Sequence, residues 1–154
     1  MREYVRNSEY HQDIKKLREL LSKVTDEKKL NILKQTTSRL TGGTALHAAA
    51  DRGDAEMIAT ILSSLQSSYR LKLLMMRDDD NNTPLHAAAQ GGHTESVRAI
   101  LTSMTADQQI ELLAAERWDC KAAVDMASGE TAYVLSEYKI KAEEKADPGE
   151  FYFI

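Results

Sequence analysis

The sequence has 154 residues, of which 42% are hydrophobic, 29% charged and 6% aromatic, a composition typical of one globular domain rather than of a disordered or fibrous chain. The formal net charge of −4 argues against nucleic acid and anionic membrane surfaces as partners, because both attract basic proteins. The sequence has no apolar run of bilayer length, no signal peptide, and a single cysteine, Cys120, which cannot form an internal disulfide. We therefore expect a soluble cytoplasmic protein.

The first segment, residues 1–38, is predicted to be helical. Its apolar residues follow a helical stripe in two groups, Leu17, Leu20, Leu21 and Val24, and then Leu30, Ile32 and Leu33. The same stripe returns 41 residues later as the second part of a longer unit. Because the first part of that unit is not recognisable here, we interpret the segment as an N-terminal capping half-repeat.

A repeat begins after this segment. Residues 44–50, TALHAAA, recur as residues 83–89, TPLHAAA, and a weaker copy follows at residues 122–127, AAVDMA, with a shift of 39 residues each time. Thr83 and Pro84 suit the start of a short helix, Gly92 suits a left-handed turn at its end, and the apolar spacing from Val97 to Met104 predicts a second helix. Each copy therefore reads as a helical hairpin that must stack on its neighbours to bury its apolar stripe.

Each copy also has room for a third, shorter helix after the hairpin. The apolar spacing places it at residues 26–34, 68–76 and 106–115. Thr105 and Gln108 have the spacing of a capping box, and Thr25 and Ser67 are the N-cap candidates in the other two copies. We expect this helix to lie between the hairpin and the turn that leads into the next repeat.

These features resemble the ankyrin repeat, whose signature is Thr-Pro-Leu-His followed by alanines. The copy from residue 78 to 101 carries the family landmarks Asp78, Thr83, Pro84, Leu85, His86, Ala88, Ala89, Gly92, His93, Val97, Ile100 and Leu101. The period of 39 residues exceeds the usual ankyrin period of about 33, and the predicted third helix accounts for the surplus. The resemblance implies an all-α solenoid of helical hairpins with an extra short helix in each repeat.

The resemblance also divides the chain. We expect a half-repeat at 1–38, ankyrin repeats at 39–77 and 78–116, a degenerate capping repeat at 117–143, and a polar linker with an aromatic tail at 144–154. In the last copy Cys120 stands where the turn would carry glycine, so its turn is expected to depart from the others. In the copy before it, Asn81 takes the glycine's place and tolerates a left-handed conformation.

No group of residues predicts catalysis or a cofactor. The resemblance gives His47, His86 and His93 structural roles, and the histidines lack the spacing of a helical zinc site. Residues 78–89 begin like a calcium loop but have Thr83 at position six and Ala89 at position twelve, where that loop needs glycine and glutamate. We therefore predict no enzyme activity, no bound metal and no cofactor.

In the ankyrin family, partners bind the concave face formed by the turns and the first helices. The residues of this chain that the resemblance places there are Leu40, Thr41, Gly43, Asp51, Arg52, Asp79, Asp80, Asn82, Gln90, Gly91, Trp118, Asp119 and Lys121. Trp118 is the only tryptophan, and an exposed tryptophan often dominates an interface. Packing of Trp118 against the cap or the preceding extra helix is the alternative.

The last four residues, Phe151, Tyr152, Phe153 and Ile154, form an aromatic tail that includes both phenylalanines of the chain. The tail either packs on the cap, binds another copy or a partner, or marks a truncation boundary. The sequence thus predicts a non-catalytic scaffold or adaptor that binds an unidentified protein. A homo-oligomer assembled through the tail and a targeting or regulatory segment of a larger enzyme are the alternatives.

Overall fold

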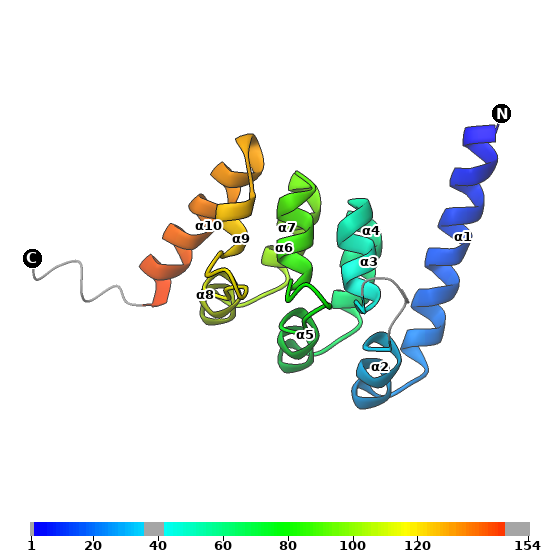
Figure 1. Cartoon of the computed structure of the whole chain (residues 1–154). Helices are drawn as coiled ribbons and strands as arrows, with labels where there is room; N and C mark the ends of the chain where they lie inside the picture. The colour runs from blue at the N-terminus through cyan, green and yellow to red at the C-terminus, as the bar shows by residue number, and fades with distance from the viewer. Residues whose placement is uncertain (1, 36–41, 147–154) are drawn as a thin grey trace, which may run out of the picture.

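The computed structural model describes residues 2–35 and 42–146 and arranges their helices in three parallel rows (Figure 1). The outer row holds α1 (Arg2–Ser22), α4 (Ala55–Ser63), α7 (Thr94–Thr102) and α10 (Gly129–Ala146). The inner row holds α3 (Ala45–Arg52), α6 (Pro84–Gln90) and α9 (Ala123–Met126). The third row holds α2 (Asp26–Leu33), α5 (Ser67–Leu74) and α8 (Ala106–Leu113). The all-α solenoid expected from the repeats is thereby confirmed.

The rows follow from the sequence period, because helices 39 to 41 residues apart pack side by side. Inner helix α6 lies between α3 and α9, outer helix α4 packs on α1 and α7, and third-row helix α5 packs on α2 and α8. Contacts therefore run mainly between neighbouring repeats, as in other solenoids. None of the helices in the described ranges is both long and apolar enough to cross a membrane.

Local sequence sets where the helices begin and end. Pro84 occupies the first turn of α6, and the Thr83 hydroxyl accepts a hydrogen bond from the His86 backbone N–H at 3.4 Å. The predicted capping box of α8, formed by Thr105 and Gln108, is also present. The prediction for α5 was wrong by one position, because Gln66 rather than Ser67 is the N-cap.

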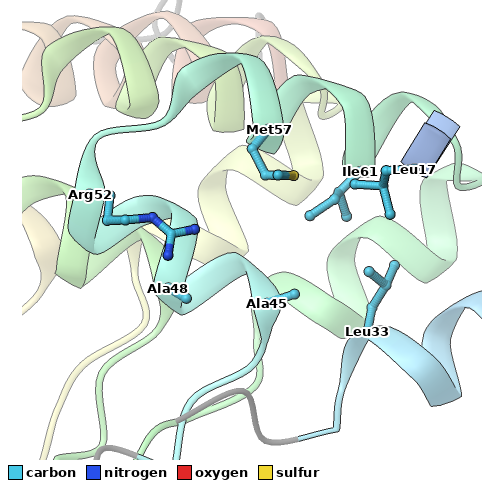
Figure 2. Close-up of a pocket in the computed structure, with 7 residues that line it drawn as sticks. All are labelled: Leu17, Leu33, Ala45, Ala48, Arg52, Met57 and Ile61. Carbon is cyan, nitrogen blue, oxygen red and sulfur yellow. The ribbon is translucent and has the colours of Figure 1, made fainter. Parts of the chain in front are cut away.

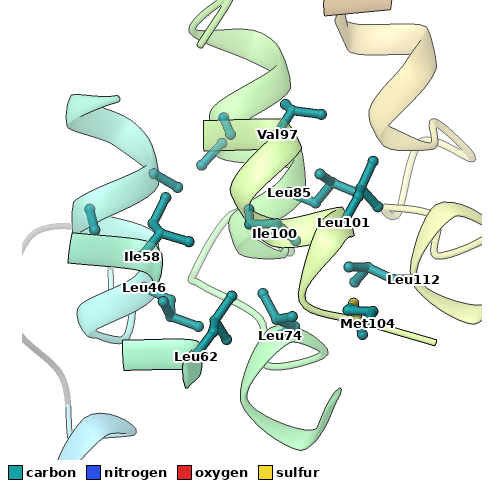
Figure 3. Close-up of a cluster of buried hydrophobic side chains, with 14 of the residues drawn as sticks. Leu46, Ile58, Leu62, Leu74, Leu85, Val97, Ile100, Leu101, Met104 and Leu112 are labelled. Atoms are coloured by element: carbon teal, nitrogen blue, oxygen red, sulfur yellow. The ribbon is translucent and has the colours of Figure 1, made fainter. Parts of the chain in front are cut away.

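A continuous apolar core lies between the rows (Figure 3). Leucines at equivalent positions of the two full repeats are entirely buried, as for Leu46 and Leu85 in the inner helices and Leu62 and Leu101 in the outer helices. Burying a leucine side chain contributes about 1.5–3 kcal/mol. The inner helices also carry alanines. Their small side chains let neighbouring helices approach closely, so the leucines pack closely in the core between them.

The third row ties the outer helices together through one recurring position. Lys29, Arg70 and Gln109 stand at that position in α2, α5 and α8. The Arg70 guanidinium donates to two carbonyls at the end of α4 at 2.6 and 2.8 Å and to the Ser103 carbonyl at the end of α7 at 2.9 Å. Lys29 Nζ donates to the Ser64 carbonyl at 2.6 Å, and Gln109 Nε2 donates to a carbonyl in α7 at 2.7 Å. These donors add hydrogen bonds to carbonyls at, or just after, the C-terminal ends of the outer helices, where helix carbonyls carry partial negative charge.

Candidate partner-binding surface

The turns between repeats share one backbone feature. Gly42, Asn81 and Cys120, which are 39 residues apart, have φ angles of 64°, 62° and 57°. All three lie in the left-handed region, which glycine adopts easily and other residues adopt rarely. Asn81 behaves as the sequence predicts. The last turn, in contrast, keeps the left-handed conformation despite Cys120, so the expected departure at this position was wrong.

A buried histidine of each full repeat holds the turn of the following repeat. His47 Nδ1 accepts a hydrogen bond from the Thr44 N–H at 3.1 Å, so Nε2 carries the proton and donates to the Asn82 carbonyl at 2.8 Å. His86 makes the same two contacts, with the Thr83 N–H at 3.3 Å and the Lys121 carbonyl at 3.2 Å. Both rings thus have the structural role implied by the resemblance, and both are fixed in one tautomer.

Burial lowers the pKa of both His47 and His86 below the ordinary value of 6.5, although their carbonyl partners oppose the shift. Both imidazoles are therefore neutral at pH 7. Protonation of either ring at Nδ1 would turn this nitrogen into a donor that faces the threonine N–H, and the hydrogen bond between them would be lost. The inter-repeat hydrogen bonds thus depend on the neutral rings.

The middle turn is braced further by its own side chains. The Asp78 carboxylate accepts hydrogen bonds from the backbone N–H groups of Asp80 and Asn82 at 3.0 and 2.8 Å. The Arg77 guanidinium donates to the Asn81 carbonyl at 3.0 Å and to the Glu116 carbonyl, in the following repeat, at 2.9 Å. The turn that presents Asp79 and Asp80 is therefore ordered before any partner binds.

Trp118 lies on the next turn with 77% of its surface exposed. With the Asn81 amide oriented to satisfy both donors, its oxygen accepts hydrogen bonds from the Trp118 backbone N–H at 3.2 Å and the indole Nε1–H at 3.1 Å. The indole is thus positioned by the neighbouring turn, while most of its surface remains open to a partner. This arrangement differs from the alternative in which Trp118 packs against the cap.

The residues that the sequence assigned to a partner surface fall into three groups. The exposed group consists of Asp51, Arg52, Asp79, Asp80, Gln90, Gly91, Trp118, Asp119 and Lys121. Gly43 and Asn82 are buried, so their side of the expected surface is not open in this structure, and a role of either residue in partner binding stays a prediction. Leu40, Thr41 and the tail residues Phe151, Tyr152, Phe153 and Ile154 lie outside the described residues.

Five of the exposed members lie on two neighbouring turns. Asp79 and Asp80 share a turn, and Trp118, Asp119 and Lys121 share the next turn. Lys121 Nζ lies 3.8 Å from an Asp119 carboxylate oxygen, an exposed ion pair that contributes little to stability. Sequence reasoning missed Arg77 and the role of Asn81 as a hydrogen-bond acceptor for Trp118. The 39-residue spacing between Arg77 and Glu116 was an available signal, because equivalent positions of neighbouring repeats lie side by side.

The described residues contain no group of three or more His, Cys, Asp or Glu side chains that could hold a metal ion. What the geometry presents is a row of rigid turns with exposed side chains on stacked helical hairpins. That architecture defines the class of solenoid proteins built from stacked helical hairpins.

A family model for ankyrin repeats matches residues 8–112 in three copies, so the chain belongs to the ankyrin repeat family. Its fold is also similar to a chain in the crystal structure of the yeast ribosomal protein Rps3 in complex with its chaperone Yar1. The sequences are 18% identical, the match covers 84% of this chain and 83% of that chain, and the TM-score is 0.60. No curated protein matches the chain.

Proposed function

We propose that this protein is a non-catalytic adaptor that binds a protein partner through the turns carrying Asp79, Asp80 and Trp118. The observation that carries the proposal is the indole of Trp118, which is 77% exposed yet positioned through hydrogen bonds to Asn81. A surface that is ordered before binding loses little conformational entropy when a partner arrives. Membership of the ankyrin family supports a binding role, as does likeness to a chain from a chaperone complex.

The side chains on these turns indicate the chemistry of the partner. Asp79 and Asp80 are exposed on one turn, and Asp119 is exposed beside Trp118 on the next. Carboxylates at this density favour a partner surface that presents lysine or arginine. The indole favours an apolar recess in the partner, because tryptophan contributes most to affinity where it is fully desolvated. The proposed partner therefore combines basic residues with an apolar pocket, and we place the interaction in the cytoplasm.

Affinity capture from lysate with the purified chain tests the proposal. The turn variant carries Asp79→Ala, Asp80→Ala and Trp118→Ala. We expect a partner retained by the wild type to be reduced at least about tenfold on the turn variant, which corresponds to about 1.4 kcal/mol of binding free energy. The thermal midpoint should change little, because the three side chains are exposed.

A matched control variant carries Tyr133→Ala, Glu143→Ala and Glu144→Ala on α10. It also removes one exposed aromatic side chain, with 70% of its surface exposed, and two exposed carboxylates. The proposal requires that this control retain the partner. Equal capture by the turn variant and the wild type, or equal loss on both variants, would contradict it.

A further inference from the structure

Among the described residues, no helix packs on the side of α3 that faces α1 and α2 as α3 itself packs on α6. Ala45, Ala48 and Arg52, three or four residues apart on one face of α3, line a groove of about 470 Å³. Leu17 of α1 and Leu33 of α2 form the far side, and α4 closes the top (Figure 2). In the described part of the half-repeat, α1 and α2 supply an outer and a third-row helix, but no inner helix precedes α3.

The equivalent packing position in the next repeat, on α6, shows what kind of helix such a groove binds. Pro84 and Ala87 of α6 correspond to Ala45 and Ala48 of α3, and α3 packs on α6. Ala87 is 8% exposed, whereas Ala48 is only half-buried. The difference arises because α3 covers the second repeat, while no helix in the described ranges covers the first. The groove therefore continues the interface on which the inner helices of this chain already stack.

The helix at that position, α3, indicates the size and shape of a helix that the groove would bind. α3 has eight residues, and its Leu46, Ala49 and Ala50 are 0% exposed. An eight-residue helix is about 12 Å long. Small residues let it approach closely, and one leucine fills the space between the inner and outer rows. Inner helices of successive repeats run in the same direction, so an occupant that packs as α3 does would end beside Arg52.

Arg52 supplies the charge that selects the occupant. Arg52 stands where the next repeat has Gly91. Its side chain is exposed and forms no ion pair with the described side chains of residues 10–35 and 42–145. A helix that ends beside a guanidinium is favoured, because its last carbonyls carry partial negative charge. A carboxylate in that last turn adds a charge-assisted hydrogen bond. In α3 itself, Asp51 lies in the last turn, and its backbone carbonyl accepts a hydrogen bond from His93 Nε2 of the next repeat at 3.0 Å.

We propose that this groove binds a two-turn helix from a partner protein, parallel to α3, with a leucine and two small residues facing the groove and a carboxylate beside Arg52. The site lies at the N-terminal end of the solenoid and shares no residue with the turns at Asp79, Asp80 and Trp118. Its occupant adds an inner helix to the half-repeat and completes the stack.

The probe is a fluorescein-labelled, helix-stapled peptide with the sequence of residues 43–53 and an internal Arg52→Ala change, titrated into the full chain by fluorescence anisotropy. We expect saturable binding. Ala48→Gln in the protein should weaken it at least about tenfold, because the longer side chain fills the groove and glutamine is still a good helix former. The matched control, Ala114→Gln, makes the same change at an exposed position on the third row and should bind as the wild type does.

Charge reversal tests the orientation. The protein variant Arg52→Glu should lose affinity for this peptide and regain it for a peptide in which Asp51→Lys is added. Absence of binding, or equal affinity for wild type and Ala48→Gln, would overturn the proposal. So would tighter, Ala48-dependent binding of a linear peptide of residues 147–154, because the occupant would then be the tail of a second copy. The turn variant Asp79→Ala, Asp80→Ala and Trp118→Ala should bind the helical peptide normally, which separates this site from the proposed function.

Discussion

Replacing His86 with alanine tests whether buried histidines hold the turns. The ring is 0% exposed, and its Nδ1 contacts the Thr83 N–H at 3.3 Å and the Thr83 hydroxyl at 2.8 Å, while Nε2 donates to the Lys121 carbonyl at 3.2 Å. Each hydrogen bond contributes about 1 kcal/mol net. Because the two Thr83 donors share the one lone pair of Nδ1, the ring makes the equivalent of about two hydrogen bonds. His86→Ala should therefore lower the free energy of unfolding by about 2 kcal/mol, and the thermal midpoint by about 4–8 °C for a chain of this size.

Urea denaturation followed by circular dichroism measures this loss. Fluorescence of Trp118, the only tryptophan, reports the last turn in the same samples. The control is His93→Ala, because His93 is only partly buried and one hydrogen bond, from Nε2 to the Asp51 carbonyl at 3.0 Å, anchors its ring. It should cost about 1 kcal/mol or less. If His86→Ala costs no more than His93→Ala, the histidine contacts do not stabilise the turns as argued.

Three further predictions concern stability. Burial lowers the pKa of His47 and His86 below 6.5, so the unfolded chain binds more protons than the folded chain at acidic pH. The contribution of these residues to stability should therefore be full above about pH 6.5 and fall below it. A thermal midpoint unchanged between about pH 7 and 5 would contradict this. Arg70→Met removes hydrogen bonds of 2.6, 2.8 and 2.9 Å and should cost about 2 kcal/mol by urea denaturation. Gly42→Ala and Gly92→Ala should each cost about 1–2 kcal/mol in the same assay, because both positions have positive φ. The new methyl group at Gly42 would meet only the exposed Asp79 carboxylate, which can move aside, so a much larger loss at Gly42 would refute this account.

The 39-residue period made the rows of helices predictable. Because the period recurs, the sequence located the third-row helices to within two residues at each end and the left-handed turn at Asn81. The ankyrin family follows from the same repeat. The division of the chain into repeats at 39, 78 and 117 stays a prediction, as does the role of the aromatic tail.

The remaining features depend on contacts between repeats, which a linear pattern does not encode. Exposure of Trp118 follows from the Asn81 amide on the neighbouring turn. Burial of Asn82 follows from the carbonyl contact with His47, which lies 35 residues earlier. Cys120 adopts a left-handed conformation next to Lys121, whose carbonyl accepts a hydrogen bond from His86 of the preceding repeat. In each case tertiary contacts outweighed the intrinsic preference of the residue.

In the proposed function, the same turns serve stability and partner binding through different atoms. His47 and His86 bind backbone carbonyls, which every residue possesses, so these two contacts between repeats place no demand on the outward-facing side chains of the turns. The exposed side chains of Asp79 and Trp118 can therefore be selected for a partner without weakening the fold. The groove beside α3 differs in this respect, because its lining belongs to the apolar stacking surface itself. A ligand in the groove would contact the apolar stacking face of α3, whereas a ligand at the turns would contact the exposed side chains that each repeat carries there.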